Sequence, residues 1–575
     1  MKNYIINIVI VEFAAFLFSC SCGDGEALLL KNGNVVDGQT RRIICADVLV
    51  RDGVIAEVGE NIADKGCRVI DCTGKTVTAG YVDAHVHIES SMVLPFAFGE
   101  AVLPHGTTTV IADPHEIVNV AGAEGLRFFL DAAAQSPIDI FTVVPSSVPA
   151  TPYDTNGAGE FLAEDMREFV PREDVVGLGE VMCFGDVVAR KKTIMDKIAL
   201  FRQAGKTIDG HTAGMPDSML DAYISAGVSD DHECSDVQAM VERYNRGMNI
   251  YVREGSAARN ARELLEYAFA NRLDTSKFAF CTDDKHLATI AAEGHISYIV
   301  AMARAIGFDW GSVAQMASYN PCRYYGLAKR GNIRKGYKAD IVVTNDEGTT
   351  EFYVIKDGRV VACDGQLTEP KPQHPAQPKF ENTVKFRDVT AADFTVPQPL
   401  HGIALALTDG QLLTSLAKYD SEADWEALPM LANIERHGKR GDIAVCKIAG
   451  YGIRGGAVAT SVSHDSHNVI CAGDNAADMA LACNMLKTIG GGYVIARNGE
   501  IIGELPMPAF GLMSVLDAQS TSQIIAGLDE TAHMMGVNPN IDAFTTLSFV
   551  ALPVIPSVRL LDTGLFDVDN GKFIE

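Results

Sequence analysis

Residues 77–92 read VTAGYVDAHVHIESSM, an apolar strand-like run that ends in two histidines and a glutamate. Side chains alternate between the two faces of a strand, so His85 and His87 share one face while Val86 packs on the other. Two imidazoles on one face suit a divalent cation. Isolated pairs of this kind are also common among ordinary surface or core histidines, so the rest of the chain decides between the two interpretations.

Seven further apolar runs follow, and helical stretches separate them. We expect these strands to end near Asp113, Ser146, Met182, His211, Glu233, Ser256 and Asp284. Together with the run that ends near His87 they make eight βα units. Continuous apolar strands with crossover helices indicate a parallel sheet covered on both faces, and eight of them predict a closed (β/α)8 TIM-like barrel of the α/β class over residues 79–330.

The segments on either side of the predicted barrel have a different pattern. Residues 27–78 carry short alternating strands with Asn-Gly and Asp-Gly turns, and a matching segment returns at residues 331–367. We interpret the two as one split β-sandwich that brackets the barrel. The proline-rich residues 368–378 predict a linker. Residues 379–575 predict an α+β domain with a helix at 476–488 and a hairpin that turns at Asn498-Gly499.

Composition restricts the class of partner. Lys+Arg number 48 against 74 Asp+Glu, a formal net charge of −26. This charge repels phosphate backbones and anionic membranes, so we expect neither nucleic acid nor a membrane as partner and favour a small neutral or cationic substrate. The 13 cysteines are scattered without a CxxC pair, which favours reduced thiols and a cytoplasmic location.

The first residues carry a weak signal for export. Residues 5–18 are largely apolar, and residues 17–20 resemble a lipoprotein cleavage site that would anchor the chain through Cys20. Only Lys2 precedes the run as a positive charge, Glu12 interrupts it, and it is too short to span a bilayer. We therefore interpret residues 1–26 as an N-terminal helical extension, with export or lipid anchoring as the alternative.

Polar residues stand at the C-terminal ends of the predicted barrel strands, where barrels of this kind carry their chemistry. A carboxylate can bridge two metals whereas an imidazole nitrogen serves one, so Glu180 is the predicted bridge. Imidazoles and an aspartate complete the ligand sets of the two metals. The sequence thus predicts two divalent ions that share a bridging hydroxide, with the ligands His85, His87, Glu180, His211, His232 and Asp283.

The bracketed barrel and the ligand order H-x-H, Glu, His, His, Asp resemble the amidohydrolase superfamily and, within it, the bacterial adenine deaminase family. Long motifs similar to that family's lie at residues 84–92, 112–120, 252–260, 281–285 and 463–468. The resemblance covers nearly the whole chain after the first two dozen residues. It implies hydrolysis of adenine to hypoxanthine and ammonia in purine salvage, two Mn²⁺ or Fe²⁺ ions, and a homo-oligomer.

The residues agree with this chemistry. Displacement of the amino group from C6 of adenine needs a strong nucleophile, a proton on a ring nitrogen and a proton on the departing nitrogen. A metal-bridged hydroxide supplies the nucleophile at neutral pH. We expect Asp283 to take the hydroxide's proton and pass it to the leaving group, and Glu89 to protonate the ring. Asp284 can exchange roles with Asp283, and the sequence does not separate the two.

Five further residues are candidates for contacts with the substrate. Asp113 and His115 follow the second strand at the barrel mouth, where they orient the base or support a ligand. Arg253, Glu254 and Ser256 lie at the C-terminal end of the predicted seventh strand. An arginine beside a glutamate is about as often a structural pair, so that alternative stays open.

Residues 464–467, His-Asp-Ser-His, form a second polar cluster far along the chain. They suit a separate metal site or a cap over the barrel mouth. We favour a hydrogen-bonded turn with packed histidines, because no third motif supports a separate site there.

Other functions fit less well. Hydantoinase-like enzymes, which open cyclic amides at two metals, bridge them with a carboxylated lysine on the fourth strand, where this chain has Glu180. The zinc cytidine-deaminase fold needs P-C-x-x-C after H-x-E, and Pro321-Cys322 lacks the second cysteine. A barrel that serves only for binding would have lost a metal ligand, and none of the six is missing.

Overall fold

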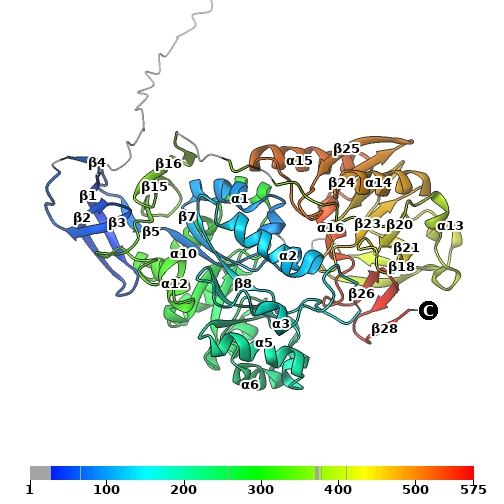
Figure 1. The fold of residues 1–575 in the computed structure, drawn as a ribbon, viewed down its shortest axis with the longest axis horizontal. Coiled ribbons are helices and arrows are strands. Elements are labelled where there is room, and N and C mark those ends of the chain that lie inside the picture. Colours follow the sequence, from blue (N-terminus) through cyan, green and yellow to red (C-terminus); the bar gives the residue numbers. More distant parts are fainter. Residues whose placement is uncertain are drawn as a thin grey trace, which may run out of the picture.

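The computed structural model describes residues 27–574 apart from residues 65, 154, 257, 370–373, 377, 409 and 410. Three parts follow one another along the molecule: an N-terminal sheet, a barrel and a C-terminal domain (Figure 1). The predicted N-terminal extension and its lipoprotein-like signal lie outside the described residues. Within the described part of the chain, no helix is long and apolar enough to cross a membrane.

The eight predicted barrel strands are present, and each ends within three residues of the predicted position. They are β6 Tyr81–Val86, β7 Thr107–Ala112, β8 Asp139–Val144, β9 Val175–Val181, β10 Thr207–Gly210, β11 Asp230–Asp231, β12 Asn249–Arg253 and β13 Phe278–Cys281. Parallel pairing joins β6 to β10 in one ladder and β11 to β13 in another. A parallel bridge between Val86 and Asp283 connects the first strand to the end of the last.

The barrel is least regular between β10 and β11. The predicted strand that ends near Glu233 should start near Gly227, but within residues 227–232 only Asp230–Asp231 has strand geometry. Side chains replace part of the ladder, because the Asp230 carboxylate accepts hydrogen bonds from Gly210 N (3.0 Å) and from Ser229 Oγ (2.7 Å). Local hydrogen bonding by serine and aspartate competes with strand pairing in this way.

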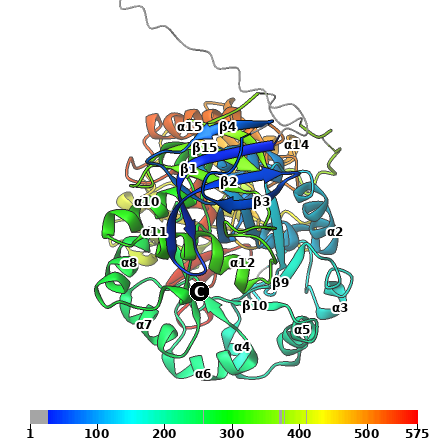
Figure 2. The ribbon, with the colours of Figure 1, turned by 90° about the vertical axis from the view of Figure 1, so that its left-hand side faces the viewer.

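Helices surround the barrel strands, as Figure 2 shows for α2 to α8. In α5 the residues Ile194, Ile198 and Phe201 are buried at helical spacing, so one face packs on the strands. The helices are α1 Pro95–Val102, α2 His115–Ala133, α3 Ala163–Met166, α4 Phe184–Val188, α5 Lys192–Gln203, α6 Asp217–Ala226, α7 Val237–Asn245, α8 Ala261–Ala270, α9 Leu287–Glu293, α10 Ile296–Ile306, α11 Trp310–Ala314 and α12 Asn320–Tyr324.

The two segments that flank the barrel in sequence share one continuous nine-stranded sheet. Strand β5 joins them, since it pairs with β1 in parallel and with β14 antiparallel, with Ala79 opposite Ile341. The strands are β1 Ala27–Asp37, β2 Arg42–Arg51, β3 Val54–Gly59, β4 Cys67–Asp71, β5 Thr76–Ala79, β14 Ile341–Thr344, β15 Glu351–Lys356, β16 Arg359–Cys363 and β17 Gln366–Leu367.

Ion pairs connect the barrel to this sheet at Asp139, the first residue of β8. Its Oδ2 lies 2.5 Å from Arg330, 2.6 Å from Lys338 and 2.7 Å from Lys356. Burial raises the pKa of Asp139, but the three cations more than offset this and hold it well below its usual range.

The C-terminal domain contains an eight-stranded sheet, β18 to β25, and a three-stranded sheet, β26 to β28. The predicted helix is confirmed as α14 Ala476–Thr488, where the Asn475 side chain accepts a hydrogen bond from Asp478 N at the helix start. The predicted hairpin turns at Asn498 (φ 52°) and Gly499 (φ 80°). The other helices are α13 Glu422–Glu426, α15 Ala518–Met534 and α16 Ala543–Phe549.

The strands of this domain are β18 Ile403–Leu407, β19 Thr414–Lys418, β20 Met430–Ile434, β21 Ile443–Ala449, β22 Ala457–Thr460, β23 Val469–Gly473, β24 Gly492–Arg497, β25 Glu500–Pro506, β26 Val558–Leu561, β27 Gly564–Asp567 and β28 Lys572–Phe573. Residues 461–468, between β22 and β23, are all buried. We call them the mouth loop, because they contact the end of the barrel that carries the predicted ligands.

Candidate metal centre

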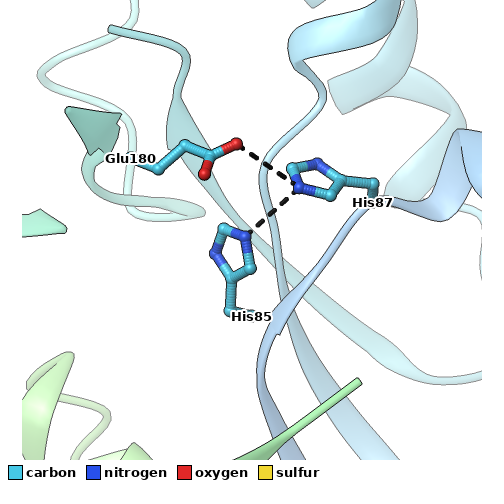
Figure 3. A group of neighbouring side chains, drawn as sticks. All are labelled: His85, His87 and Glu180. Carbon is cyan, nitrogen blue, oxygen red and sulfur yellow. Dashed lines mark hydrogen bonds and ion pairs between the residues drawn. The ribbon is translucent and has the colours of Figure 1, made fainter. Parts of the chain in front are cut away.

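His85 and His87 leave the end of β6 toward the same point. Both are buried, and their Nε2 atoms lie 3.3 Å apart (Figure 3). The Nδ1 of His87 lies 2.8 Å from the carbonyl oxygen of Asp113. Since a carbonyl only accepts, Nδ1 carries a proton, which leaves Nε2, the nitrogen that faces Glu180 and Asp283, as the one that would bind a cation. Metal-binding histidines commonly have this second partner.

Glu180, near the end of β9, lies between two groups of imidazoles. Its Oε1 is 3.4 Å from His87 Nε2, and its Oε2 is 2.6 Å from His211 Nδ1 and 3.3 Å from His232 Nε2. One carboxylate oxygen therefore faces each group. This is the arrangement that a carboxylate shared by two cations requires.

The backbone at Glu180 is held by Asp113, whose Oδ2 accepts a hydrogen bond from Glu180 N (2.9 Å). The residue before it must be small, because a Cβ on Gly179 would lie 2.2 Å from that oxygen. Burial and the charge of Glu180 raise the pKa of Asp113 to about 7. Asp113 thus supports the bridge from its backbone side and also positions His87 through its carbonyl.

Asp283 and Asp284, which the sequence does not separate, differ in their contacts. Asp283 has a left-handed backbone (φ 57°), and its Oδ1 lies 3.1 Å from His87 Nε2 and 3.7 Å from His85 Nε2. Asp284 instead accepts a hydrogen bond from Ser90 Oγ. Burial raises the pKa of Asp283, but Arg253 and His87 lower it well below its usual range, whereas burial and the charge of Asp283 raise that of Asp284.

The residues present fit two divalent cations. The ligand atoms of His85, His87 and Glu180 lie within 4.8 Å of one another, and so do those of Glu180, His211 and His232, so the two groups share only the carboxylate of Glu180. Within the described chain, Nδ1 of His85 and both ring nitrogens of His232 lack a hydrogen-bond partner although they are buried. Burial and the neighbouring imidazoles lower the pKa of His85, which keeps it in the neutral form that binds metal.

Glu89 follows His87 in the 3-10 turn Ile88–Ser91. Its Oε1 accepts a hydrogen bond from Ile117 N (3.3 Å), and its buried Oε2 has no hydrogen-bond partner among the described residues. Burial and the nearby Glu116 raise the pKa of Glu89 to about 8. The carboxyl group is therefore protonated at neutral pH and able to donate a proton.

The three candidates at the end of the seventh strand, β12, differ in the contacts that they make. Arg253 lies in the cluster, where its Nη1 contacts Glu233 and lies 2.8 Å from Asp283 Oδ2. Glu254 accepts a hydrogen bond from Ala261 N (3.2 Å) at the start of α8. Ser256 Oγ lies 2.8 Å from Thr289 Oγ1. The contacts of Glu254 and Ser256 that the structure gives are thus outside the ligand cluster.

Sequence reasoning missed two carboxylates at the centre. Glu233 lies 3.4 Å from His232 Nε2 and pairs with Arg253, and its only sequence signal is that it follows His232. Glu116 contacts the mouth loop: its Oε1 is 2.9 Å from His464 Nδ1, and its Oε2 contacts His467 Nε2. Its only signal is that it follows His115.

Comparison with known proteins places the chain. Residues 76–367 match the amidohydrolase family, and residues 411–572 match the adenine deaminase C-terminal domain. An adenine deaminase of Lysinibacillus sphaericus is 38% identical over 560 residues, which cover 95% of this chain and 96% of that protein. That of Nitratidesulfovibrio vulgaris (strain Hildenborough) is 39% identical over 557 residues, with the same coverage. The chain belongs to the adenine deaminase family.

Solved structures of the superfamily are more distant. An adenine deaminase structure is 18% identical with a TM-score of 0.45, and covers 59% of this chain and 99% of that one. A D-hydantoinase is 16% identical with a TM-score of 0.44, and covers 60% and 97%. The barrel residues of the metal centre lie inside the match to the amidohydrolase family. The mouth loop lies inside the match to the adenine deaminase C-terminal domain.

Proposed function

We propose that this chain hydrolyses adenine to hypoxanthine and ammonia at the end of its barrel. One observation carries the proposal: Glu180 lies between two groups of imidazoles, in a chain whose relatives of matching length are adenine deaminases. Ring opening of a cyclic amide is the second candidate, and its support is distant structural likeness alone.

The cluster would hold two divalent cations, whose Lewis acidity makes hydroxide available at neutral pH. Asp283 is anionic and in contact with His87, so it accepts the proton of the attacking water and delivers it to the departing amino nitrogen. Glu89 is protonated and donates to a ring nitrogen of adenine. Arg253 holds Asp283 in place through the ion pair at its other oxygen.

The test is a pair of assays on purified protein of known metal content. We expect ammonia release from adenine and no ring opening of a hydantoin or dihydropyrimidine. Ring opening without ammonia release would replace the proposal with the second candidate. If the protein with its full metal content consumed neither adenine nor the cyclic amide, both candidate functions would be contradicted.

Several finer features belong to the same proposal. The nitrogen and oxygen donors, without thiolate, support manganese or ferrous iron as the cations. The sheets support domain boundaries at residues 27–78 with 331–367, 79–330 and 379–575, with 368–378 as linker. A cytoplasmic location and homo-oligomeric assembly stay predictions from the sequence and the family resemblance.

A further inference from the structure

His115, the first residue of α2, lies between carboxylates from two parts of the molecule. Its Nδ1 is 3.1 Å from Glu180 Oε1 in the barrel, and its Nε2 is 3.2 Å from Asp465 Oδ1 in the mouth loop. All three residues are at most 6% exposed. The C-terminal domain thus reaches the bridging carboxylate through one imidazole.

The two contacts fix how the ring is used. One ring nitrogen faces Asp465 and the other faces Glu180, so a rotation of the ring at one contact also changes the other. The carboxylate of Asp465 therefore holds the ring in the orientation in which Nδ1 contacts Glu180.

The bridging role of Glu180 depends on the rotation of its carboxylate, and terminal carboxylate torsions are only weakly restricted by the side chain itself. Its Oε2 faces His211 and His232, while its Oε1 faces His87 and accepts from His115. Among these imidazoles, His115 is outside the predicted ligand set. Its hydrogen bond remains available to hold the carboxylate when the other imidazoles bind cations.

We propose that Asp465 of the C-terminal domain is a positioning residue for the metal centre, acting through His115 on the bridging carboxylate of Glu180. The proposal deepens the proposed function and rests on it. The mouth loop has its own attachment to the barrel, because His464 and His467 contact Glu116. Removing the Asp465 charge therefore leaves the loop attached.

The experiment measures how strongly the holoenzyme retains its metals against a chelator. Loss of a residue that hydrogen-bonds to a metal ligand typically lowers metal affinity or activity by about ten- to a hundredfold. Asp465→Asn and His115→Asn should each weaken retention within that range, and kcat for adenine should fall more than KM changes. If Asp465 acts through His115, the double variant should retain metal no worse than His115→Asn alone.

Asp562→Asn is the matched control, because Asp562 is a buried carboxylate of the same domain that interacts with Thr155 and Arg440. It should leave metal retention unchanged. Asp465→Glu keeps the charge and should retain metal better than Asp465→Asn; it also carries the test if the asparagine variant does not fold. Normal retention in Asp465→Asn, or losses that multiply in the double variant, would overturn the proposal.

Two outcomes distinguish this proposal from the proposed function and from a metal site in the mouth loop. Retention is measured without substrate, so a wild-type protein that does not deaminate adenine would overturn the proposed function while the chelator series still decides the role of Asp465. A third metal equivalent that disappears in His467→Gln would overturn the interpretation of the mouth loop as a hydrogen-bonded support.

Discussion

Two of the buried groups of histidine and glutamate in the described part of the chain differ in the tautomers of their histidines. In the barrel, His87 Nδ1 faces the Asp113 carbonyl, so its Nε2 offers a lone pair. In the mouth loop, His467 Nδ1 accepts a hydrogen bond from Ser463 N (3.2 Å), so Nε2 carries the proton that it donates to Glu116. The partner of the far ring nitrogen therefore separates a ligand from a structural histidine.

The largest expected effect is that of metal removal. A chelator should abolish ammonia release from adenine, and Mn²⁺ or Fe²⁺ should restore it, because hydroxide is scarce at neutral pH without a cation to acidify water. The measurement is turnover against metal content. Full turnover in metal-free protein would show that the barrel cluster is no more a metal site than the mouth loop.

Asp283→Asn should lower turnover by several orders of magnitude, because an amide still offers an oxygen to a cation but does not accept the proton. The KM for adenine should change much less. Asp284→Asn should lower turnover less, since Asp284 contacts Ser90 rather than the imidazoles. If the order is reversed at equal metal content, the proton acceptor is Asp284; near-normal rates in both would assign the transfer to another group such as Glu89.

Substitutions of histidine test the comparison of the two clusters directly. His85→Ala and His211→Ala should each reduce the metal content, because they remove imidazoles that face Glu180 or Asp283. His467→Gln should keep two metals per chain, since its Nε2 is a donor. Metal analysis of the three purified variants decides. Two metals in both alanine variants would refute the ligand assignment.

Among the described residues, the ion-pair partners of Asp139 are all basic, so this carboxylate should act in stability alone. Asp139→Asn should lower stability at pH 7 by about 2 kcal/mol, the value of hydrogen bonds to charged groups. The folded pKa of Asp139 lies below its unfolded value, so this stabilisation is complete above the unfolded pKa of about 3.9 and is lost as pH falls through the folded pKa. The free energies of unfolding of the wild type and Asp139→Asn, measured at pH 7 and below pH 3, should differ less at the lower pH.

The predicted elements were those whose signal is local. Most barrel strands are apolar runs with a polar residue at or near their C-terminal end, as in residues 77–87, and the helix at 476–488 begins after a capping Asn475. The alternation of side chains along β6 was enough to direct His85 and His87 toward one point. Such patterns depend on a few neighbouring residues, and a single sequence contains them.

The missed features depend on distant contacts or on one torsion angle. Glu116 meets His467 across 351 positions of the chain, and no periodicity connects them. Asp283 and Asp284 are the same residue type side by side, and the left-handed backbone at Asp283 decides which one faces the imidazoles. The strand expected at 227–232 is shorter in the structure because side chains take up its hydrogen bonds. Ser229 Oγ donates to the Asp230 carboxylate, and that carboxylate also accepts from Gly210 N.

The position of β5 in the nine-stranded sheet has a consequence for biosynthesis. Its partner β14 lies roughly 260 residues further along the chain, with the whole barrel between them. At about 5–20 residues per second, the ribosome needs roughly 15 to 50 seconds to deliver that partner. Until β14 is synthesised, the edge of β5 that it will cover has no partner in this sheet, and an unpaired edge of this kind is a site where other strands can pair.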